Sequence, residues 1–312
     1  MHAKCRLTET WRGSAIALAL LCGGAAGAAQ DAPAADHALR VMTYNLRYAN
    51  PGDGTQHWPN RLHAAASVFT DYAPAIAGTQ EGLLGQLEDL AGALPDYRWL
   101  GRERAEGSEH CAIFYDARRL APLEHDTLWL SDTPRVPGSR SWGNQLPRIV
   151  TWARFEERGT GRRLVAVNTH LDHQSEPSRQ ASIRMIQKLI RETFAGEAVV
   201  LTGDFNSGAD GEVHRLALCT GGGPDCVPLT DAWTAAARRS GPEGTFHGFR
   251  GEPGAARIDW ILYTAPFAAL RAETVDRRYG EHYPSDHYPV VADLQLPAAS
   301  AGGAPDRPGP AR

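Results

Sequence analysis

The chain has 312 residues, of which 42% are hydrophobic and 22% are charged, and its formal net charge is −4 at pH 7. This length is sufficient for one large hydrophobic core or two smaller ones. Tight, non-specific binding to duplex nucleic acid depends on many phosphate contacts, so an acidic chain without a basic run is a poor candidate for that function.

Residues 1–28 have the composition of a cleaved export signal. Lys4, Arg6 and Arg12 precede the apolar run "AIALALLCGGAAGA", which ends in small residues that suit a cleavage site. The run is too short to span a bilayer. We therefore expect a periplasmic or extracellular protein without a membrane anchor, in which residues 29–36 form a short linker.

Strand-like and helix-like runs alternate from residue 39 onward. The strand-like runs are 39–46, 75–81, 97–103, 111–116, 127–131, 148–157, 163–172, 198–206, 257–263 and 288–296. The helix-like runs are 59–72, 82–94, 175–194 and 229–239. This pattern predicts an α/β (α+β) domain over residues 37–296, in which packed sheets are flanked by helices. The Pro/Gly/Ala-rich tail, residues 297–312, is expected to be disordered.

Three cysteines follow the expected cleavage site. Cys219 and Cys226 bracket the flexible segment "TGGGPD", and we expect them to form a disulfide in an oxidising compartment. Cys111 lies in the apolar run "HCAIFY" and is expected to be a free thiol in the core.

Polar side chains stand at or near the ends of several predicted strands, where side chains from separate elements can converge on one cleft. They are Asn45, Glu81, His170, Asp204, Asn206, Asp259, Asp286 and His287. Each also has a purely structural interpretation. Asn45 could cap a turn, Glu81 could pair with a helix dipole, and Asp286 lies among the turn formers of "YPSDHYPV".

Asp286 and His287 are adjacent, and neighbouring side chains on a strand point to opposite faces. We therefore expect the two residues to have separate roles. Asp259 lies inside the apolar run "RIDWIL", and a buried carboxylate needs a partner. We expect Asp259 to hold one ring nitrogen of His287, fix its tautomer and favour its charged form. Asp286 would then face a metal ion held with Glu81. Oxygen ligands without a Cys/His cluster favour Mg²⁺ or a similar ion over zinc.

The motifs "YNLR", "TQE", "NTHLDH", "GDFN", "RIDWIL" and "SDHYPV" occur in this order between Val41 and Leu296. The ordered set resembles the endonuclease/exonuclease/phosphatase superfamily. The resemblance implies a DNase I-like four-layer sandwich, two packed mixed β-sheets flanked by helices, with one or two ions of Mg²⁺, Mn²⁺ or Ca²⁺. It assigns the metal to Asn45, Glu81 and Asp286, the attacking water to Asp204 and Asn206, the acid–base pair to Asp259 and His287, and a second proton donor to His170.

The segments "NPGDGTQHWPNR" and "TPRVPGSRSWGNQLPRIVTW" are similar to a secreted bacterial branch of that superfamily, whose substrates are poorly defined. Arg148 is a candidate phosphate clamp, since a guanidinium matches phosphate geometry, and a salt-bridged surface arginine is the alternative. Trp142 and His247, with Trp58 and Phe249, are candidates to line a substrate pocket. Core or surface packing is the alternative for each of them.

These assignments predict a secreted metal-dependent phosphoesterase, with a phosphodiester as the favoured substrate. Water oriented by Asp204 would attack in line, and His170 or His287 would protonate the leaving oxygen. The alternatives are a phosphomonoesterase, a lipid phosphodiesterase, or a binding module that has lost the chemistry. A lipid-acting enzyme would be expected to expose an apolar hairpin, and the sequence has no such segment. We expect a monomer whose partner is a phosphate-ester substrate.

Overall fold

The computed structural model describes residues 38–223 and 225–297. The expected leader (1–28) and linker (29–36) lie outside the described residues, as does the expected tail apart from Pro297. The described residues all belong to one compact unit.

Two mixed β-sheets form the centre of this unit. The first has the strand order β10 (Arg238–Ser240), β12 (Ala268–Thr274), β13 (Val290–Gln295), β1 (Ala38–Asn45), β2 (Ile76–Gln80), β4 (Ile113–Asp116) and β3 (Tyr97–Leu100). The second has the order β5 (Leu120–Trp129), β6 (Ile149–Glu157), β7 (Arg163–His170), β8 (Val199–Asp204), β11 (Asp259–Tyr263) and β9 (Thr230–Asp231).

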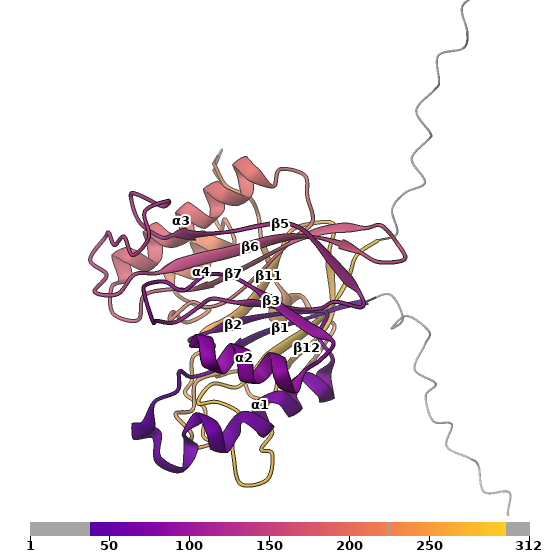
Figure 1. The fold of residues 1–312 in the computed structure, drawn as a ribbon. Helices are drawn as coiled ribbons and strands as arrows, with labels where there is room; N and C mark the ends of the chain where they lie inside the picture. Colours follow the sequence, from indigo (N-terminus) through magenta and orange to yellow (C-terminus); the bar gives the residue numbers. More distant parts are fainter. Residues whose placement is uncertain (1–37, 224, 298–312) are drawn as a thin grey trace, which may run out of the picture. The chain divides into compact units, whose positions relative to one another are not determined.

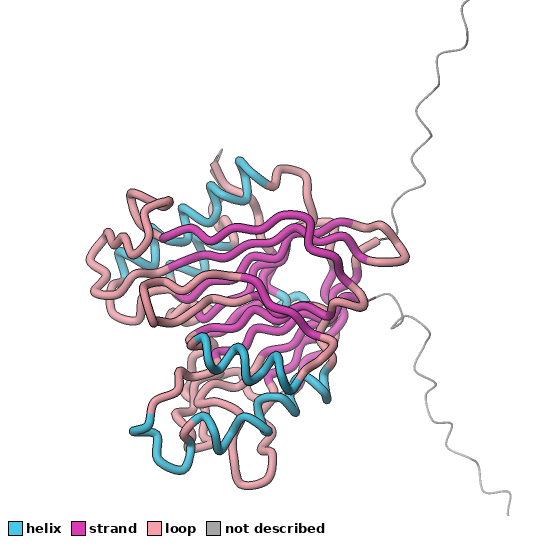
Figure 2. The backbone as a smooth tube through the Cα atoms, in the orientation of Figure 1, coloured by secondary structure: helices cyan, strands magenta, loops and turns pink. Residues whose placement is uncertain are grey.

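Helices cover the outer face of each sheet (Figure 1). The helices are α1 (Trp58–Tyr72), α2 (Leu84–Ala93), α3 (Glu176–Thr193), α4 (Glu212–Ala217) and α5 (Ala232–Ala235), with a 3₁₀ segment at Pro51–Gln56. Helices α1 and α2 pack on the first sheet, and α3 and α4 pack on the second. The layers are therefore helix, sheet, sheet and helix, which confirms the expected four-layer sandwich; Figure 2 shows the two magenta sheets between cyan helices.

Alternating side chains along each strand build the separate cores. In β1, Leu39 and Val41 enter the core between the sheets, whereas Met42 and Tyr44 enter the core under α1 and α2. Helix α3 contributes a stripe of isoleucines, including Ile183 and Ile186, to the core on the other outer face. A strand has a side-chain period of two and a helix a period of 3.6, so these patterns place one face of each element inward.

A buried polar bridge joins the two sheets directly below one edge of the sandwich. Gln80 Nε2 donates to Asn168 Oδ1 at 2.7 Å, and Thr202 Oγ1 donates to the same oxygen at 3.1 Å. Gly78 leaves the space for this bridge, because a Cβ at that position would lie 2.0 Å from Thr202 Oγ1 and 2.5 Å from Asn168 Oδ1. The bridge fixes the ends of β2, β7 and β8 relative to one another.

The predicted helix over residues 229–239 is wrong. Only Ala232–Ala235 is helical, and it lies between the short strands β9 and β10. The side chain of Asp231 accepts from Trp233 N, and Arg238–Ser240 pairs with β12, which the sequence pattern did not reveal. Pairing across the sheet thus outweighs the local helical preference of this alanine-rich segment.

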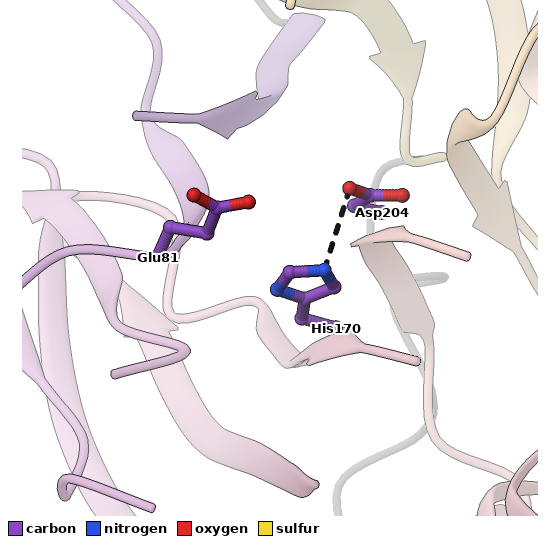
Figure 3. Close-up of side chains that lie close together, drawn as sticks. All are labelled: Glu81, His170 and Asp204. Carbon is purple, nitrogen blue, oxygen red and sulfur yellow. Dashed lines mark ion pairs between the residues drawn. The ribbon is translucent and has the colours of Figure 1, made fainter. Parts of the chain in front are cut away.

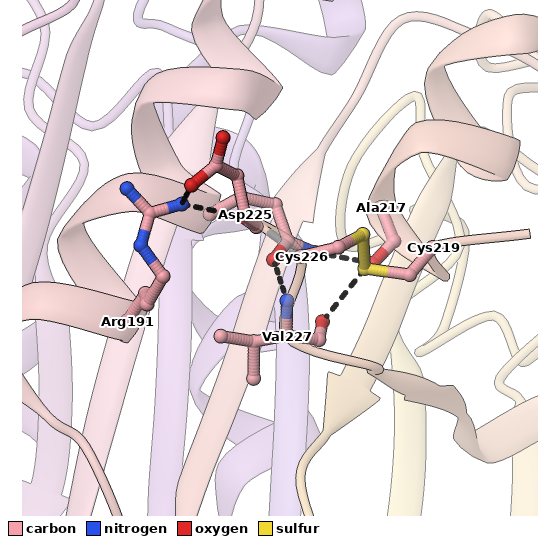
Figure 4. Close-up of a disulfide and its surroundings, with 7 residues drawn as sticks. Arg191, Ala217, Cys219, Asp225, Cys226 and Val227 are labelled. Carbon is pink, nitrogen blue, oxygen red and sulfur yellow. Dashed lines mark hydrogen bonds and ion pairs between the residues drawn. A yellow bond between two sulfur atoms is a disulfide. The ribbon is translucent and has the colours of Figure 1, made fainter. Parts of the chain in front are cut away.

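The cysteines behave as expected. Cys219 and Cys226 form a disulfide, and Cys111 is buried and free. The disulfide closes the loop between α4 and β9 (Figure 4), and Val227 N next to it donates to Gln187 Oε1 of α3 at 3.0 Å. Among the described residues, no helix combines the length and the apolar character needed to cross a membrane.

Candidate active site

The chain topology brings the predicted polar residues to one edge of the sandwich. Strands β1 and β2 are parallel, as are β7 and β8, so Asn45 lies beside Gln80 and His170 lies beside Asp204. Strand β11 begins at the same edge and places Asp259 opposite Asp204 in the antiparallel register. Glu81 follows directly after β2.

A cleft of about 500 Å³ opens at this edge. This volume is in the range of sites for small molecules. Seven of the predicted site residues line it: Glu81, Arg148, His170, Asp204, Asn206, Asp286 and His287. Asn45 and Asp259 are each 1% exposed and support the lining residues from behind.

Glu81, His170 and Asp204 converge at the centre of the cleft (Figure 3). Each offers one ligand atom, and these atoms all lie within 4.8 Å of one another. Asn45 Nδ2 donates to Glu81 Oε1 and to Asp204 Oδ2, at 3.0 Å in each case. This set of mainly oxygen donors fits a hard divalent cation. A second group that could hold an ion consists of Asp204, Asp259 and His287.

His287 is held by Asp259, whose Oδ2 lies 2.9 Å from His287 Nδ1. Burial alone would lower the pKa of His287, but the charge and hydrogen bond of Asp259, followed by the charge of Asp204, raise this pKa well above the ordinary value. The other ring nitrogen, Nε2, lies 3.8 Å from Asp204 Oδ2. The expected pairing is therefore present in the geometry, and His287 presents its Nε2 side to the cleft.

His170 has the opposite electrostatic environment. Burial, followed by the charges of Arg148 and Arg104, holds the pKa of His170 well below its ordinary value. Its Nε2 lies 3.5 Å from Asp204 Oδ2. The two histidines therefore have opposite pKa shifts, with the pKa of His170 lowered and the pKa of His287 raised.

Two carboxyl groups of the cleft have raised pKa values. Burial and the neighbouring charge of Asp259 raise the pKa of Asp204 to about 7. Burial raises the pKa of Asp286, and the charge of Glu81 adds to this shift against the opposing charge of His287. Perturbed carboxyl groups in a cleft are a recognised property of functional sites.

The backbone of the cleft is unusual at three non-glycine residues that line it. Arg47, Glu81 and Asn206 have φ angles of 54°, 64° and 48°, in the left-handed region. Such conformations are costly and tend to persist at functional sites. Asn206 is fixed by its side-chain bond to Leu171 O at 3.0 Å, while its N–H donates to Asp204 Oδ1 at 2.9 Å.

A buried arginine of α1 fixes two loops of the site. Arg61 is fully buried, and its Nη1 donates to Leu46 O at 2.7 Å and to Pro284 O at 2.9 Å. These carbonyls lie next to Asn45 in the sequence and two residues before Asp286. Sequence analysis did not identify Arg61 as a positioning residue.

Arg148 lines the cleft, while the other substrate-binding candidates lie elsewhere. The side chain of Arg148 is 2% exposed, and its Nε lies 3.4 Å from Asp172 Oδ2. Arg148 is therefore a buried arginine and not a surface one. His247 is fully buried and stacks on Tyr288 at a centroid distance of 4.0 Å. Trp142 donates from Nε1 to Asp132 Oδ1 at 3.0 Å, outside the cleft lining. Trp58 and Phe249 are likewise absent from that lining.

Sequence analysis also missed residues that line the cleft: Arg47, Tyr48, Arg104, Glu109, His173 and Phe246. Tyr48 and Arg47 immediately follow the Asn45 motif, and His173 belongs to "NTHLDH", so proximity to those motifs was an available signal. Arg104, Glu109 and Phe246 come from connecting segments whose sequence carries no periodic pattern.

A sequence model of the Endonuclease/Exonuclease/phosphatase family matches residues 42–287. The chain belongs to this family. The match confirms the resemblance drawn from the ordered motifs, and members of the endonuclease/exonuclease/phosphatase family are phosphoesterase or nuclease hydrolases.

Two solved structures of this family from Bacteroides are similar over most of the chain. A mannosyl-6-phosphatase of Bacteroides thetaiotaomicron is 33% identical with a TM-score of 0.78, over 83% of this chain and 100% of that one. An endonuclease/exonuclease/phosphatase of Bacteroides vulgatus is also 33% identical, with a TM-score of 0.78, over 83% of this chain and 99% of that one.

Two curated relatives match shorter segments. Nocturnin of Drosophila melanogaster is 26% identical over 238 residues, which are 65% of this chain, and an uncharacterised protein of Acanthamoeba polyphaga mimivirus is 27% identical over 160 residues, which are 48% of it. The matches span only 35% of nocturnin and 59% of the viral protein.

Proposed function

We propose that this protein is a metal-dependent phosphoesterase and that its substrate is a phosphate monoester. The observation that carries the proposal is the convergence of Glu81, His170 and Asp204 beside the Asp259–His287 pair in one cleft. The mannosyl-6-phosphatase, which is 33% identical over its whole length, supports a monoester over the phosphodiester favoured by sequence analysis.

Glu81 would be the principal ligand of the metal, with Asp286 and the amide of Asn45 on the same side of the cleft. The amide nitrogen of Asn45 now faces Glu81, and its oxygen accepts from Arg47 N at 2.9 Å. The orientation of an amide group is assigned from its hydrogen-bond network. A cation beside Glu81 would favour the flipped orientation of the Asn45 amide, in which its oxygen faces the cation. When bound, a divalent ion neutralises charge on the phosphate oxygens.

The protein side chains divide the proton transfers between them. Asp204, whose pKa is raised to about 7, is suited to accept a proton from the attacking water as the new P–O bond forms. His287 is cationic and donates its Nε2 proton to the leaving alcohol oxygen as the ester P–O bond breaks. Asp259 keeps His287 in the tautomer with Nδ1 protonated and stabilises its charge. His170, neutral at pH 7, would donate a hydrogen bond from its ring N–H to a phosphate oxygen.

Export to an oxidising compartment is a further part of the proposal. The disulfide between Cys219 and Cys226 supports it, because disulfides persist mainly outside the cytosol. The sequence of residues 1–28, with its basic start and apolar run, supports it independently. N-terminal sequencing of the protein recovered from the producing cells is the test, and a mature chain that still begins at Met1 would contradict export.

A paired substrate screen tests the proposed activity. The purified protein is assayed with p-nitrophenyl phosphate and with bis-p-nitrophenyl phosphate, each in Mg²⁺, in Mn²⁺ and in excess chelator. We expect hydrolysis of the monoester in the presence of metal and at least tenfold slower hydrolysis of the diester. Faster hydrolysis of the diester would restore the phosphodiesterase assignment. If neither ester is hydrolysed, and no natural phosphate ester that is offered is hydrolysed either, the result would favour a binding module.

A further inference from the structure

One end of the cleft contains an ion pair that the proposed chemistry does not use. Arg104 and Glu109, from the connection between β3 and β4, both line the cleft, and Arg104 Nη2 lies 2.6 Å from Glu109 Oε1. Arg148 lines the cleft as well, and a small recess continues from there past Arg104, Glu109 and Arg148 to His170. This pair therefore adjoins the centre where the phosphate would react.

The backbone holds the ion pair in place. Arg104 N donates to Glu109 O at 2.9 Å, so the segment between them is a closed loop. Trp129 Nε1 donates to Arg104 O at 2.8 Å and anchors this loop to β5. The side chains of Arg104 and Glu109 are 9% and 15% exposed, respectively. A binding group on such a fixed loop loses little conformational entropy when a ligand arrives.

The charges at this end of the cleft are balanced. Arg104 is paired with Glu109, and Arg148 is paired with Asp172 at 3.4 Å. A groove that binds a polynucleotide needs unpaired cationic side chains along the phosphates. A carboxylate in the wall of such a groove would repel the phosphates. Balanced donors and acceptors suit a neutral partner with several hydroxyl groups, because each hydroxyl both donates and accepts.

Two groups at this end have hydrogen-bonding capacity to spare. Arg148 Nη1 is buried and has no hydrogen-bond partner among the described residues. An ionised carboxylate has roughly four lone-pair sites, and the contact with Arg104 engages only one oxygen of Glu109. A buried donor without a partner costs about 1–3 kcal/mol, and an acceptor supplied by a ligand or by water would remove that cost.

The mouth of the cleft adds an apolar surface. Phe246 and Leu146 line it and are 40% and 39% exposed, among the larger exposed apolar side chains of the described residues. Phe246 also packs edge-on against the ring of His287 at a centroid distance of 5.0 Å. The C–H face of a sugar ring can pack on such an aromatic side chain while its hydroxyls reach polar groups that line the same cleft.

We propose that Glu109 and Arg104 form a leaving-group subsite that binds the hydroxyls of a sugar or polyol, with Phe246 packing on its apolar face. The substrate class would then be a phosphate monoester of a polyhydroxyl compound. The inference rests on the proposed function, since it identifies the alcohol that leaves when the phosphate is hydrolysed. Glu109 accepts hydrogen bonds from two substrate hydroxyls. Arg104 orients Glu109 and donates a hydrogen bond to a hydroxyl oxygen of the same sugar or polyol.

The test compares hexose phosphates with an aryl phosphate as substrates of wild-type protein and of Glu109→Gln. Mannose 6-phosphate and glucose 6-phosphate carry the hydroxyls, and p-nitrophenyl phosphate lacks them. We expect Glu109→Gln to lower kcat/KM for the hexose phosphates by about 10- to 100-fold, the range for a hydrogen bond to a charged group. The loss for p-nitrophenyl phosphate should be at least tenfold smaller. Glu109→Asp, which keeps the charge but shortens the side chain, should show the same substrate dependence with a smaller loss.

The outcomes separate this inference from the proposed function. If neither hexose phosphates nor p-nitrophenyl phosphate are hydrolysed in the presence of metal, the proposed function fails. If they are hydrolysed but Glu109→Gln lowers both classes equally, or neither, the subsite is refuted and the ion pair is structural. If Glu109→Gln hydrolysed ATP, which leaves the polyanion ADP when its terminal phosphate is removed, faster than wild type does, a polyanionic leaving group would be identified and the subsite refuted. Glu88→Gln, on the exposed face of α2, is the matched control and should leave all rates unchanged.

Discussion

Asp259 Oδ2 and His287 Nδ1 lie 2.9 Å apart although the two residues are 28 positions apart in the chain. If they act as one acid–base unit, Asp259→Asn and His287→Ala should each lower kcat by about 10²–10⁴-fold, the usual contribution of a positioned proton donor. The double variant should be little worse than the worse single variant, because residues that act together are non-additive. Steady-state kinetics on mannose 6-phosphate, whose alkoxide leaving group needs a proton, measure this, with the exposed His125→Ala as control. Effects that multiply would mean that the two residues act independently.

The pH dependence of the rate follows from the same pair. The pKa of His287 is raised well above its ordinary value, so this group keeps its proton at neutral pH and loses it only as the pH rises through the raised pKa. Activity that depends on this proton should therefore fall on the alkaline side. An amide at position 259 removes the stabilising charge, lowers the pKa of His287 and should move the descending limb of the kcat–pH profile to lower pH. A limb that stays in place in Asp259→Asn would exclude His287 as the proton donor.

The polar bridge between the sheets predicts a large effect of one small substitution. In Gly78→Ala the new Cβ would meet Thr202 Oγ1 and Asn168 Oδ1 at 2.0 and 2.5 Å, so the bridge must open or the sheets must separate. We expect the free energy of unfolding to fall by about 1–3 kcal/mol, the usual cost of overpacking. Gly85→Ala in α2 meets no atom within 4 Å and should be neutral or slightly stabilising. Urea denaturation of both variants measures this, and equal stability would show that the interface between the sheets is not tightly packed.

The disulfide should contribute to stability without affecting the chemistry. Cys219 and Cys226 are separated by seven positions, and closing a loop of this size contributes on the order of 2–3 kcal/mol in the chain-entropy model. Replacing both cysteines by serine should lower the free energy of unfolding by that amount and leave kcat unchanged. Peptide mapping without reduction should find these two residues linked and Cys111 unlinked. A linkage through Cys111 would contradict the structure.

The parts of the site that lie at strand ends could be predicted from the sequence. An apolar run followed by a polar residue locates Asn45, His170 and Asp204, and parallel pairing of β1 with β2 and of β7 with β8 brings such ends to one edge. The buried carboxylate of Asp259 required a partner, and among the 12 histidines of the sequence His287 lies in the motif "SDHYPV". In each case a local pattern identifies the residue, and the strand pairing then brings it to the shared edge.

Residues whose position depends on distant pairing could not be predicted in this way. The N–H groups of His247 and Gly248 both donate to Asp286 O, at 2.9 and 3.0 Å, and this turns the His247 ring away from the cleft and onto Tyr288. Strand β12 has the sequence "AALRAET", which is rich in helix formers, and it is extended because it pairs with β13. Arg104 and Glu109 lie in a connection whose shape no periodicity determines.

The most direct test of the proposed activity is the release of inorganic phosphate from p-nitrophenyl phosphate and mannose 6-phosphate by wild-type protein and by Glu81→Gln. Glu81 would be the principal metal ligand, so the amide should weaken metal binding and lower phosphate release at least 100-fold, and excess chelator should do the same to wild type. Circular dichroism and thermal unfolding without metal should show that the variant is folded, and Glu88→Gln should match wild type. Undiminished phosphate release by Glu81→Gln at saturating Mg²⁺, or by wild type in excess chelator, would contradict metal-dependent hydrolysis in this cleft.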